Sequence, residues 1–178
     1  MSKTGKSTEG SAPGELVQGR LFPAAISASI DIAAPASLVW QVLTEFDRYH
    51  EWNSFCPKVS TDFELGSAVV MRVRLLPDRK PLRQVEYLNL LQPGHQFAWG
   101  YRFGGALLLQ ANRYQRVEAL APDQSRYSTI DQFSGLLVPL MNRLYGGYIR
   151  RGFEDMARGL KAQAEALVTD SDRRGMAD

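Results

Sequence analysis

The hydrophobic pattern of this 178-residue chain changes its period once, near Pro139, and this change limits the possible folds more than any other feature. Before it, from about residue 57 to 135, apolar residues alternate with polar ones, as in strands with one buried face. After it, apolar residues recur every three or four positions, as on one side of a helix. The helical stripe comprises Met141, Leu144, Tyr145, Tyr148, Gly152, Met156, Leu160, Ala164 and Leu167. The pattern predicts consecutive strands followed by one long amphipathic helix.

Short turn signals divide the strand region. They are Leu65-Gly66, Pro77-Asp78, Pro93-Gly94, Gly104-Gly105 and Ala121-Pro122-Asp123. Connections this short favour antiparallel neighbours. Upstream, residues 26–32 alternate as a first strand, and Pro35 opens a short helix that ends near Glu45. Asp47 is placed to cap a second short helical turn.

These elements predict an α+β helix-grip fold, in which a curved antiparallel sheet of about seven strands wraps a long C-terminal helix, with two short helices after the first strand. A helix of about 28 residues is roughly 42 Å long and crosses a whole small sheet. A strongly twisted sheet cannot close on such a helix along its length, so large side chains or a cavity must fill the gap. The predicted domain covers residues 23–168, between disordered tails at 1–22 and 169–178.

Charge and cysteine usage exclude several classes of partner. The 21 basic and 19 acidic residues leave no field for steering nucleic acid. Cys56 is the only cysteine, so no intramolecular disulfide is possible and a reducing cytoplasm fits best. No window approaches 18 uninterrupted apolar residues, and the start of the chain lacks an apolar signal region. We expect a soluble, cytoplasmic monomer or homodimer that does not span a membrane.

No motif for metal, cofactor or nucleophile chemistry is present. His50 and His95 are the only histidines and have no ligands at metal-binding spacing, so neither a metal nor a cofactor is expected. The chain has no Gly-x-Ser-x-Gly elbow. Cys56 has no obvious base beside it and is typical of a small buried hydrophobic residue rather than a nucleophile.

Two segments resemble polyketide cyclase/dehydrase-like proteins of the START-like (SRPBCC) superfamily. Residues 30–44 (IDIAAPASLVWQVLT) with 49–55 (YHEWNSF) are similar to the family's opening, and residues 131–139 (DQFSGLLVP) are similar to its last strand and the start of its final helix. The resemblance covers about residues 25–168. It implies the same helix-grip fold, which hosts binders, carriers and enzymes alike.

The sequence departs from the family pattern at two positions. Ser54 stands where a proline is usual, and Asn112 stands where a histidine is common. Chemistry that relies on this histidine therefore does not carry over to this chain.

Polar residues on two late strands are the candidates for a site. Asn112 and Tyr114 share one strand face, and Thr129 and Asp131 share a face of the next strand. If these strands pair antiparallel, Asn112, Thr129 and Asp131 can converge in an apolar cavity, where a buried carboxylate needs a partner or a proton. The alternative is a fixed salt bridge from Asp131 to a nearby arginine, either Arg113 or Arg116.

Aromatic residues are numerous enough to line a pocket, although such residues also form ordinary core. Glycines in the final helix, such as Gly152, fit either a ligand or a tight contact between helix and sheet. The predicted ligand-contacting set is Trp52, Asn53, Met71, Val73, Tyr87, Trp99, Tyr101, Asn112, Tyr114, Thr129, Asp131, Phe133, Met141, Tyr145 and Tyr148.

Three functions remain open from the sequence. The first is a noncatalytic binder of a small hydrophobic or aromatic molecule, lipid-like or polyketide-like. The second is a cyclase or dehydratase that moves protons with Asp131, Tyr114 or Arg116. The third is an interaction module that docks a partner on the outer sheet face, through Arg72 and Arg74, or on the charged face of the helix. No residue is assigned a catalytic role.

Overall fold

The computed structural model describes residues 21–76, 78–105 and 107–175, with side chains through residue 170. The predicted tail at the N-terminus lies almost entirely outside the described residues, as do residues 176–178. The elements, in chain order, are β1 (Ala24–Ile32), α1 (Ala36–Thr44), η1 (Phe46–Arg48), α2 (Tyr49–Trp52), β2 (Lys58–Ser60), β3 (Ala68–Val73), β4 (Leu82–Gln92), β5 (Gln96–Phe103), β6 (Leu109–Ala121), β7 (Gln124–Ser134) and α3 (Val138–Gly175).

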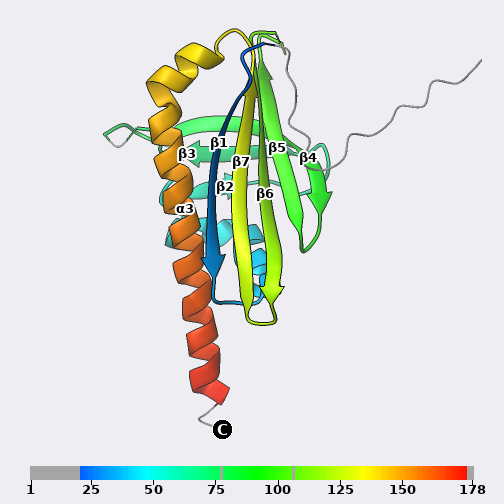
Figure 1. The fold of residues 1–178 in the computed structure, drawn as a ribbon, viewed down its shortest axis with the longest axis vertical. Helices are drawn as coiled ribbons and strands as arrows, with labels where there is room; N and C mark the ends of the chain where they lie inside the picture. Colours follow the sequence, from blue (N-terminus) through cyan, green and yellow to red (C-terminus); the bar gives the residue numbers. More distant parts are fainter. Residues whose placement is uncertain (1–20, 77, 106, 176–178) are drawn as a thin grey trace, which may run out of the picture.

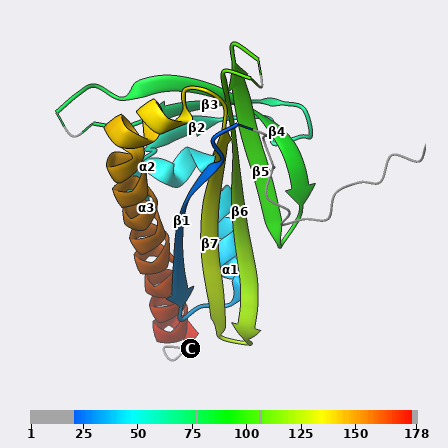
Figure 2. The ribbon, with the colours of Figure 1, turned by 45° about the horizontal axis from the view of Figure 1, so that its top comes forward.

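The seven strands form one antiparallel sheet in the order β1-β7-β6-β5-β4-β3-β2. Figure 1 shows β3 running nearly across the direction of β1 and β7, so the sheet turns strongly between its two edges. The long helix α3 lies along the β1 side, and Figure 2 shows α1 behind β6 and β7 and α2 between α3 and β1. The predicted helix-grip fold is confirmed.

Helix α3 is longer than the sequence pattern predicts. It spans 38 residues and continues past residue 168 to Gly175, through part of the segment predicted as a disordered tail. Thr169 Oγ1 donates to the Glu165 carbonyl 3.0 Å away, one helical turn back. Steps of four residues drift by about 40° around a helix. The predicted stripe therefore leaves the buried face in the first turns, where Leu144 is 51% exposed.

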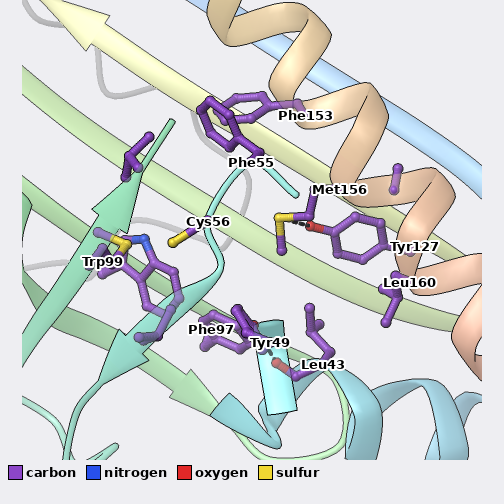
Figure 3. Close-up of a cluster of buried hydrophobic side chains, with 14 of the residues drawn as sticks. Leu43, Tyr49, Phe55, Cys56, Phe97, Trp99, Tyr127, Phe153, Met156 and Leu160 are labelled. Atoms are coloured by element: carbon purple, nitrogen blue, oxygen red, sulfur yellow. Dashed lines mark hydrogen bonds between the residues drawn. The ribbon is translucent and has the colours of Figure 1, made fainter. Parts of the chain in front are cut away.

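The short helices fill one end of the concave side of the sheet. Leu43 of α1 and Tyr49 of α2 are almost fully buried, and the Tyr49 hydroxyl donates to the Leu43 carbonyl at 2.6 Å. Figure 3 shows these two residues beside Phe97, with Tyr127 and Leu160 nearby. The predicted cap at Asp47 is wrong, because Asp47 lies inside η1 and α2 starts without a side-chain cap.

Two glycines let α3 approach this filled end. A Cβ on Gly152 would collide with the ring of Phe55, and a Cβ on Gly159 would collide with the Trp52 carbonyl oxygen. Gly152 therefore makes a tight packing contact, but with Phe55 of the segment after α2 and not with the sheet as one of its interpretations expected. Among the described residues, no helix is long and apolar enough to cross a membrane.

Candidate functional site

A cavity of about 260 Å³ lies between the sheet and the N-terminal half of α3. Strands β3 to β7 and the segment after β3 provide one wall, α3 provides the other, and the segment after α2 contributes one side chain. The lining residues are Phe55, Met71, Val73, Leu75, Leu82, Gln84, Glu86, Trp99, Tyr101, Arg113, Asp131, Phe133, Met141, Tyr145, Ile149 and Phe153.

The strand register decides which side chains reach the cavity. Residues paired across an antiparallel ladder point to the same face, and their neighbours along the strand point to the other. Met71 pairs with Gln84 across β3 and β4. Arg113 pairs with Trp99 on one side and with Asp131 on the other. Polar residues from β4, β6 and β7 therefore share a concave face with aromatic ones.

Phe55 and Phe153 separate the cavity from the filled end. Their rings meet edge to face, with centroids 5.8 Å apart. Figure 3 shows the pair beside α3. Because Gly152 has no side chain, the Phe55 ring can lie directly against the helix. The cavity thus has a well-packed floor.

Arg113 is a buried cation whose contacts face this floor. Its Nε donates to Thr129 Oγ1 at 3.0 Å, its Nη2 lies 3.1 Å from Met156 Sδ, and its guanidinium carbon lies 4.0 Å from the centroid of the Phe153 ring. The side chain is only 6% exposed. The guanidinium is therefore held by Thr129, Met156 and Phe153, although Asp131 is its cross-strand neighbour.

Neither of the two predicted salt bridges of Asp131 is present in the described part of the chain. Arg116 instead pairs with Glu118 at the surface, 3.4 Å away. Asp131 Oδ1 is buried and has no hydrogen-bond partner among the described residues. The salt-bridge alternative is wrong because Arg113 is directed toward Thr129 and Met156 rather than across the ladder.

Burial raises the pKa of both carboxyl groups of the cavity. It raises the pKa of Glu86 to about 8, the nearby Asp131 charge adds to this rise, and Arg113 and Gln84 oppose it. Burial also raises the pKa of Asp131 to about 7, opposed by Arg113. Glu86 accepts a hydrogen bond from Gln84 Nε2. Near neutral pH, burial thus favours the protonated form of these carboxyl groups.

Tyr101 lies close to both acids. Burial raises the pKa of its phenol to about 12, and the charges of Glu86 and Asp131 contribute to the shift. Tyr101 therefore stays protonated at neutral pH and can donate a hydrogen bond.

The structure brings eight of the predicted ligand-contacting residues to the cavity wall. They are Met71, Val73, Trp99, Tyr101, Asp131, Phe133, Met141 and Tyr145. Ligand contact itself remains a prediction for all of them.

Three other predicted residues are buried in the core and do not line the cavity. Trp52 packs on Tyr49 with ring centroids 4.7 Å apart. Asn53 Oδ1 accepts the Cys56 amide at 2.8 Å, which orders the loop after α2. Thr129 Oγ1 donates to the Tyr114 carbonyl at 3.1 Å. Thr129 therefore acts through Arg113, whose position it fixes.

Four further predicted residues point away from the cavity. Tyr87 and Asn112 line a groove on the outer face of the sheet, and Asn112 Oδ1 accepts a hydrogen bond from Asn89 at 2.7 Å. Tyr114 shares the outer parity of Asn112. Tyr148 lies beside Arg151, whose guanidinium carbon is 5.1 Å from its ring centroid. The predicted convergence of Asn112 with Asp131 is wrong, because the register pairs Asp131 with Arg113.

Eight lining residues were not predicted from the sequence, and the alternation along one strand was an available signal for some of them. Leu82, Gln84 and Glu86 alternate along β4 with the same parity as the buried Leu88. A similar signal was present in β6, where Arg113 shares its parity with the apolar Leu109, Ala111 and Val117. The missed residues are Phe55, Leu75, Leu82, Gln84, Glu86, Arg113, Ile149 and Phe153.

A metal does not explain the acids. No group of three histidine, cysteine or carboxylate side chains that could hold a metal ion occurs within residues 21–76, 78–105 and 107–170. Cys56 is buried, and burial raises the pKa of its thiol to about 11. A protonated, enclosed thiol is a poor nucleophile.

Comparison with known proteins gives the same fold. The profile of a family described as "Polyketide cyclase / dehydrase and lipid transport" matches residues 23–165. No curated protein matches the chain. Among solved structures, the chain is similar to the Zhui aromatase/cyclase from Streptomyces sp. R1128, with 17% identity, a TM-score of 0.67, and coverage of 82% of this chain and 96% of that one.

Two further solved structures share this architecture. Norcoclaurine synthase from Thalictrum flavum, in complex with dopamine and hydroxybenzaldehyde, has 16% identity and a TM-score of 0.62 over 96% of this chain and 98% of that one. A START superfamily protein from Mycobacterium smegmatis has 16% identity and a TM-score of 0.59 over 80% and 98%. At this level of identity, the likeness establishes the fold alone.

Proposed function

The chain belongs to the polyketide cyclase/dehydrase and lipid transport family, and from this premise we propose that it binds a small hydrophobic, aromatic molecule in the cavity beneath α3. The observation that carries the proposal is the cavity itself. Its wall is mainly apolar and aromatic, with a few polar groups, which is the usual composition of a small-molecule site.

The size of the cavity limits the guest. A dry cavity of about 150 Å³ accepts benzene. A volume of about 260 Å³ therefore suits a guest of one or two rings. Trp99, Phe133 and Tyr145 offer aromatic faces to such a guest. The aromatic ligands named for the norcoclaurine synthase complex support the same size class.

Native mass spectrometry and calorimetry with 2-(1-naphthyl)ethanol, a neutral two-ring probe, test this proposal. We expect one probe per chain. Val73→Phe should weaken binding about tenfold or more, because Val73 lines the cavity and the added ring occupies its space. Val70→Phe is the matched control, since Val70 lies on the same strand with the opposite parity. Equal affinity in both variants would rule out the cavity as the binding site.

An enzymatic function is the second candidate, and the raised carboxyl pKa values favour it. A carboxyl group with a pKa of about 7 is suited to exchanging protons with a substrate at neutral pH. Of the three groups that the sequence suggested for this role, only Asp131 lines the cavity. Glu86 and Tyr101 would replace Tyr114 and Arg116 as its companions.

This candidate is tested by turnover of poly-β-keto compounds, followed as cyclisation or dehydration. Asp131→Asn should lower the rate by about 10²–10⁴-fold if Asp131 transfers a proton in the slow step. Asp62→Asn, at an exposed position, is the control. An unchanged rate in Asp131→Asn would rule out the acid/base role of Asp131, and absence of turnover by the unaltered chain would leave the noncatalytic function.

A further inference from the structure

The cavity has more acidic than basic side chains, and these side chains differ in how many hydrogen bonds they make. Two carboxyl groups, Glu86 and Asp131, and one guanidinium, Arg113, line the same space. The Arg113 donors are directed to Thr129 and Met156. If both acids are ionised, the group carries one net negative charge.

The unsatisfied atom among these three groups is a carboxyl oxygen, which acts as an acceptor when Asp131 is ionised. Asp131 Oδ1 is buried and receives no hydrogen bond in the described part of the chain, whereas Glu86 receives one from Gln84. A buried acceptor without a donor is costly, and a buried charge without a partner costs more. A guest that supplies both a donor and a positive charge would relieve both deficits.

We propose that the guest is a hydrophobic amine whose protonated nitrogen donates a hydrogen bond to Asp131, with the Glu86 carboxylate as the second anion of the site. This inference rests on the proposed function, since it assigns the chemical class of the molecule that the cavity binds. The aromatic part of the amine packs on the apolar wall formed by residues such as Trp99 and Phe133.

An anionic guest fits less well. A carboxylate would place another acceptor beside Asp131 and Glu86. It would also have to draw Arg113 away from the Phe153 ring, where its guanidinium carbon lies 4.0 Å from the centroid. A neutral alcohol can donate to Asp131 Oδ1 but brings no charge, so we expect affinity to follow the order amine, alcohol, carboxylate.

Proton linkage follows from the same groups. The titratable or charged groups near the acids are Tyr101 from β5, Arg113 from β6, Tyr145 from α3 and Cys56 from the segment after α2. Of these, Arg113 is the one basic side chain. Because burial raises the pKa of Glu86 and Asp131, the empty cavity holds protons at pH 7. An ammonium group favours the ionised acids, so amine binding should release protons.

The test compares three probes with one ring system: 2-(1-naphthyl)ethylamine, 2-(1-naphthyl)ethanol and 1-naphthylacetate. Calorimetry on the full chain at pH 7.5 should show the amine binding about tenfold or more tightly than the alcohol. The carboxylate should bind more weakly than both. The amine affinity should rise as the pH increases from about 6 to 8.5, with protons released to the buffer, and the alcohol affinity should change little.

Asp131→Asn should lower the affinity for the amine about tenfold and leave that for the alcohol within about threefold. Asp62→Asn, at an exposed position, should change neither affinity. If Asp131→Asn does not fold, the comparison of the three probes on the unaltered chain decides the matter. Alcohol binding as tight as amine binding, or tighter binding of the carboxylate, overturns the amine inference and keeps the proposed function. Absence of binding by all three probes overturns both.

Discussion

The two ends of the concave side share one sheet and one helix, yet one end is solid and the other is hollow. At the solid end, Leu43, Tyr127 and Leu160 are at most 1% exposed. At the hollow end, Met141 and Ile149 of α3 are only half-buried and face the cavity. The difference comes from α1, η1 and α2, which supply side chains to one end only.

Glycine placement follows the same division. Gly159 brings α3 into contact with the Trp52 backbone at the solid end, whereas a Cβ on Gly147, near the hollow end, would meet nothing within 4 Å. The long helix is therefore fixed at the solid end. Stability is therefore concentrated at the end where the short helices pack, and the space for a guest lies at the end where they are absent.

We expect the largest loss of unfolding free energy when a buried leucine of α3 is truncated. Leu160→Ala at the solid end should lower the free energy of unfolding by about 3 kcal/mol, since it leaves a cavity in a close-packed core. Ile149→Ala at the hollow end should lower it by only about 1 kcal/mol, because Ile149 is half-buried beside existing space. Urea unfolding of both variants checks this, and equal losses would erase the distinction between the ends.

A smaller effect is expected from adding one methyl group to a helical glycine. Gly159→Ala should cost about 2 kcal/mol, because the new Cβ collides with a backbone oxygen that cannot move aside easily. Gly147→Ala should be neutral or stabilise the protein by up to about 1 kcal/mol, through the higher helix propensity of alanine. The unfolding free energies of the two variants give the comparison. An unchanged unfolding free energy in Gly159→Ala would mean that α3 is not fixed at Gly159.

The smallest stability effect should come from the acids of the hollow end, and it should depend on pH. The folded-state pKa of Asp131 is about 7 and its ordinary value is 3.8, so the folded state holds a proton that the unfolded state has lost. Stability should therefore fall as the pH rises from about 4 to 8. Asp131→Asn should unfold like the unaltered protein near pH 4 and be about 1 kcal/mol or more stabler at pH 8.

Urea unfolding at several pH values measures this difference. Asp62→Asn, where the carboxyl group is exposed, is the control variant. A stability that rises over the same range would mean that Asp131 is paired in the folded state and that the hollow end has no unsatisfied acid.

The fold could be predicted from the sequence because strands and helices each repeat their apolar residues at a characteristic spacing. The alternation in residues 26–32 gives β1, and the change to helical spacing after Pro139 gives α3. The length of α3 was underestimated because the charged residues after Val168 resemble a tail in composition. Composition gives no information on backbone hydrogen bonds, and these bonds extend a helix once its earlier turns are packed.

The site residues could be predicted from the sequence only in part, and strand β6 shows the reason. Arg113 and Gln115 face inward between the apolar Ala111 and Val117, whereas Asn112 and Tyr114 face outward, so the polar type of the two inward residues concealed a parity that their neighbours carry. A shift of one residue exchanges the two faces completely. Aromatic residues of β5 did reveal the concave face, because Trp99 and Tyr101 share a parity that only burial explains.

Methionine methyl NMR with 2-(1-naphthyl)ethanol tests directly whether a guest binds in the cavity at the hollow end. Met71 and Met141 line the cavity from opposite walls, and Met156 is buried at the solid end. We expect the Met71 and Met141 methyl resonances to shift along one saturable curve while the Met156 resonance stays near its free position. Unmoved Met71 and Met141 resonances at saturating probe, or a Met156 shift as large as theirs, would contradict a guest site confined to the hollow end.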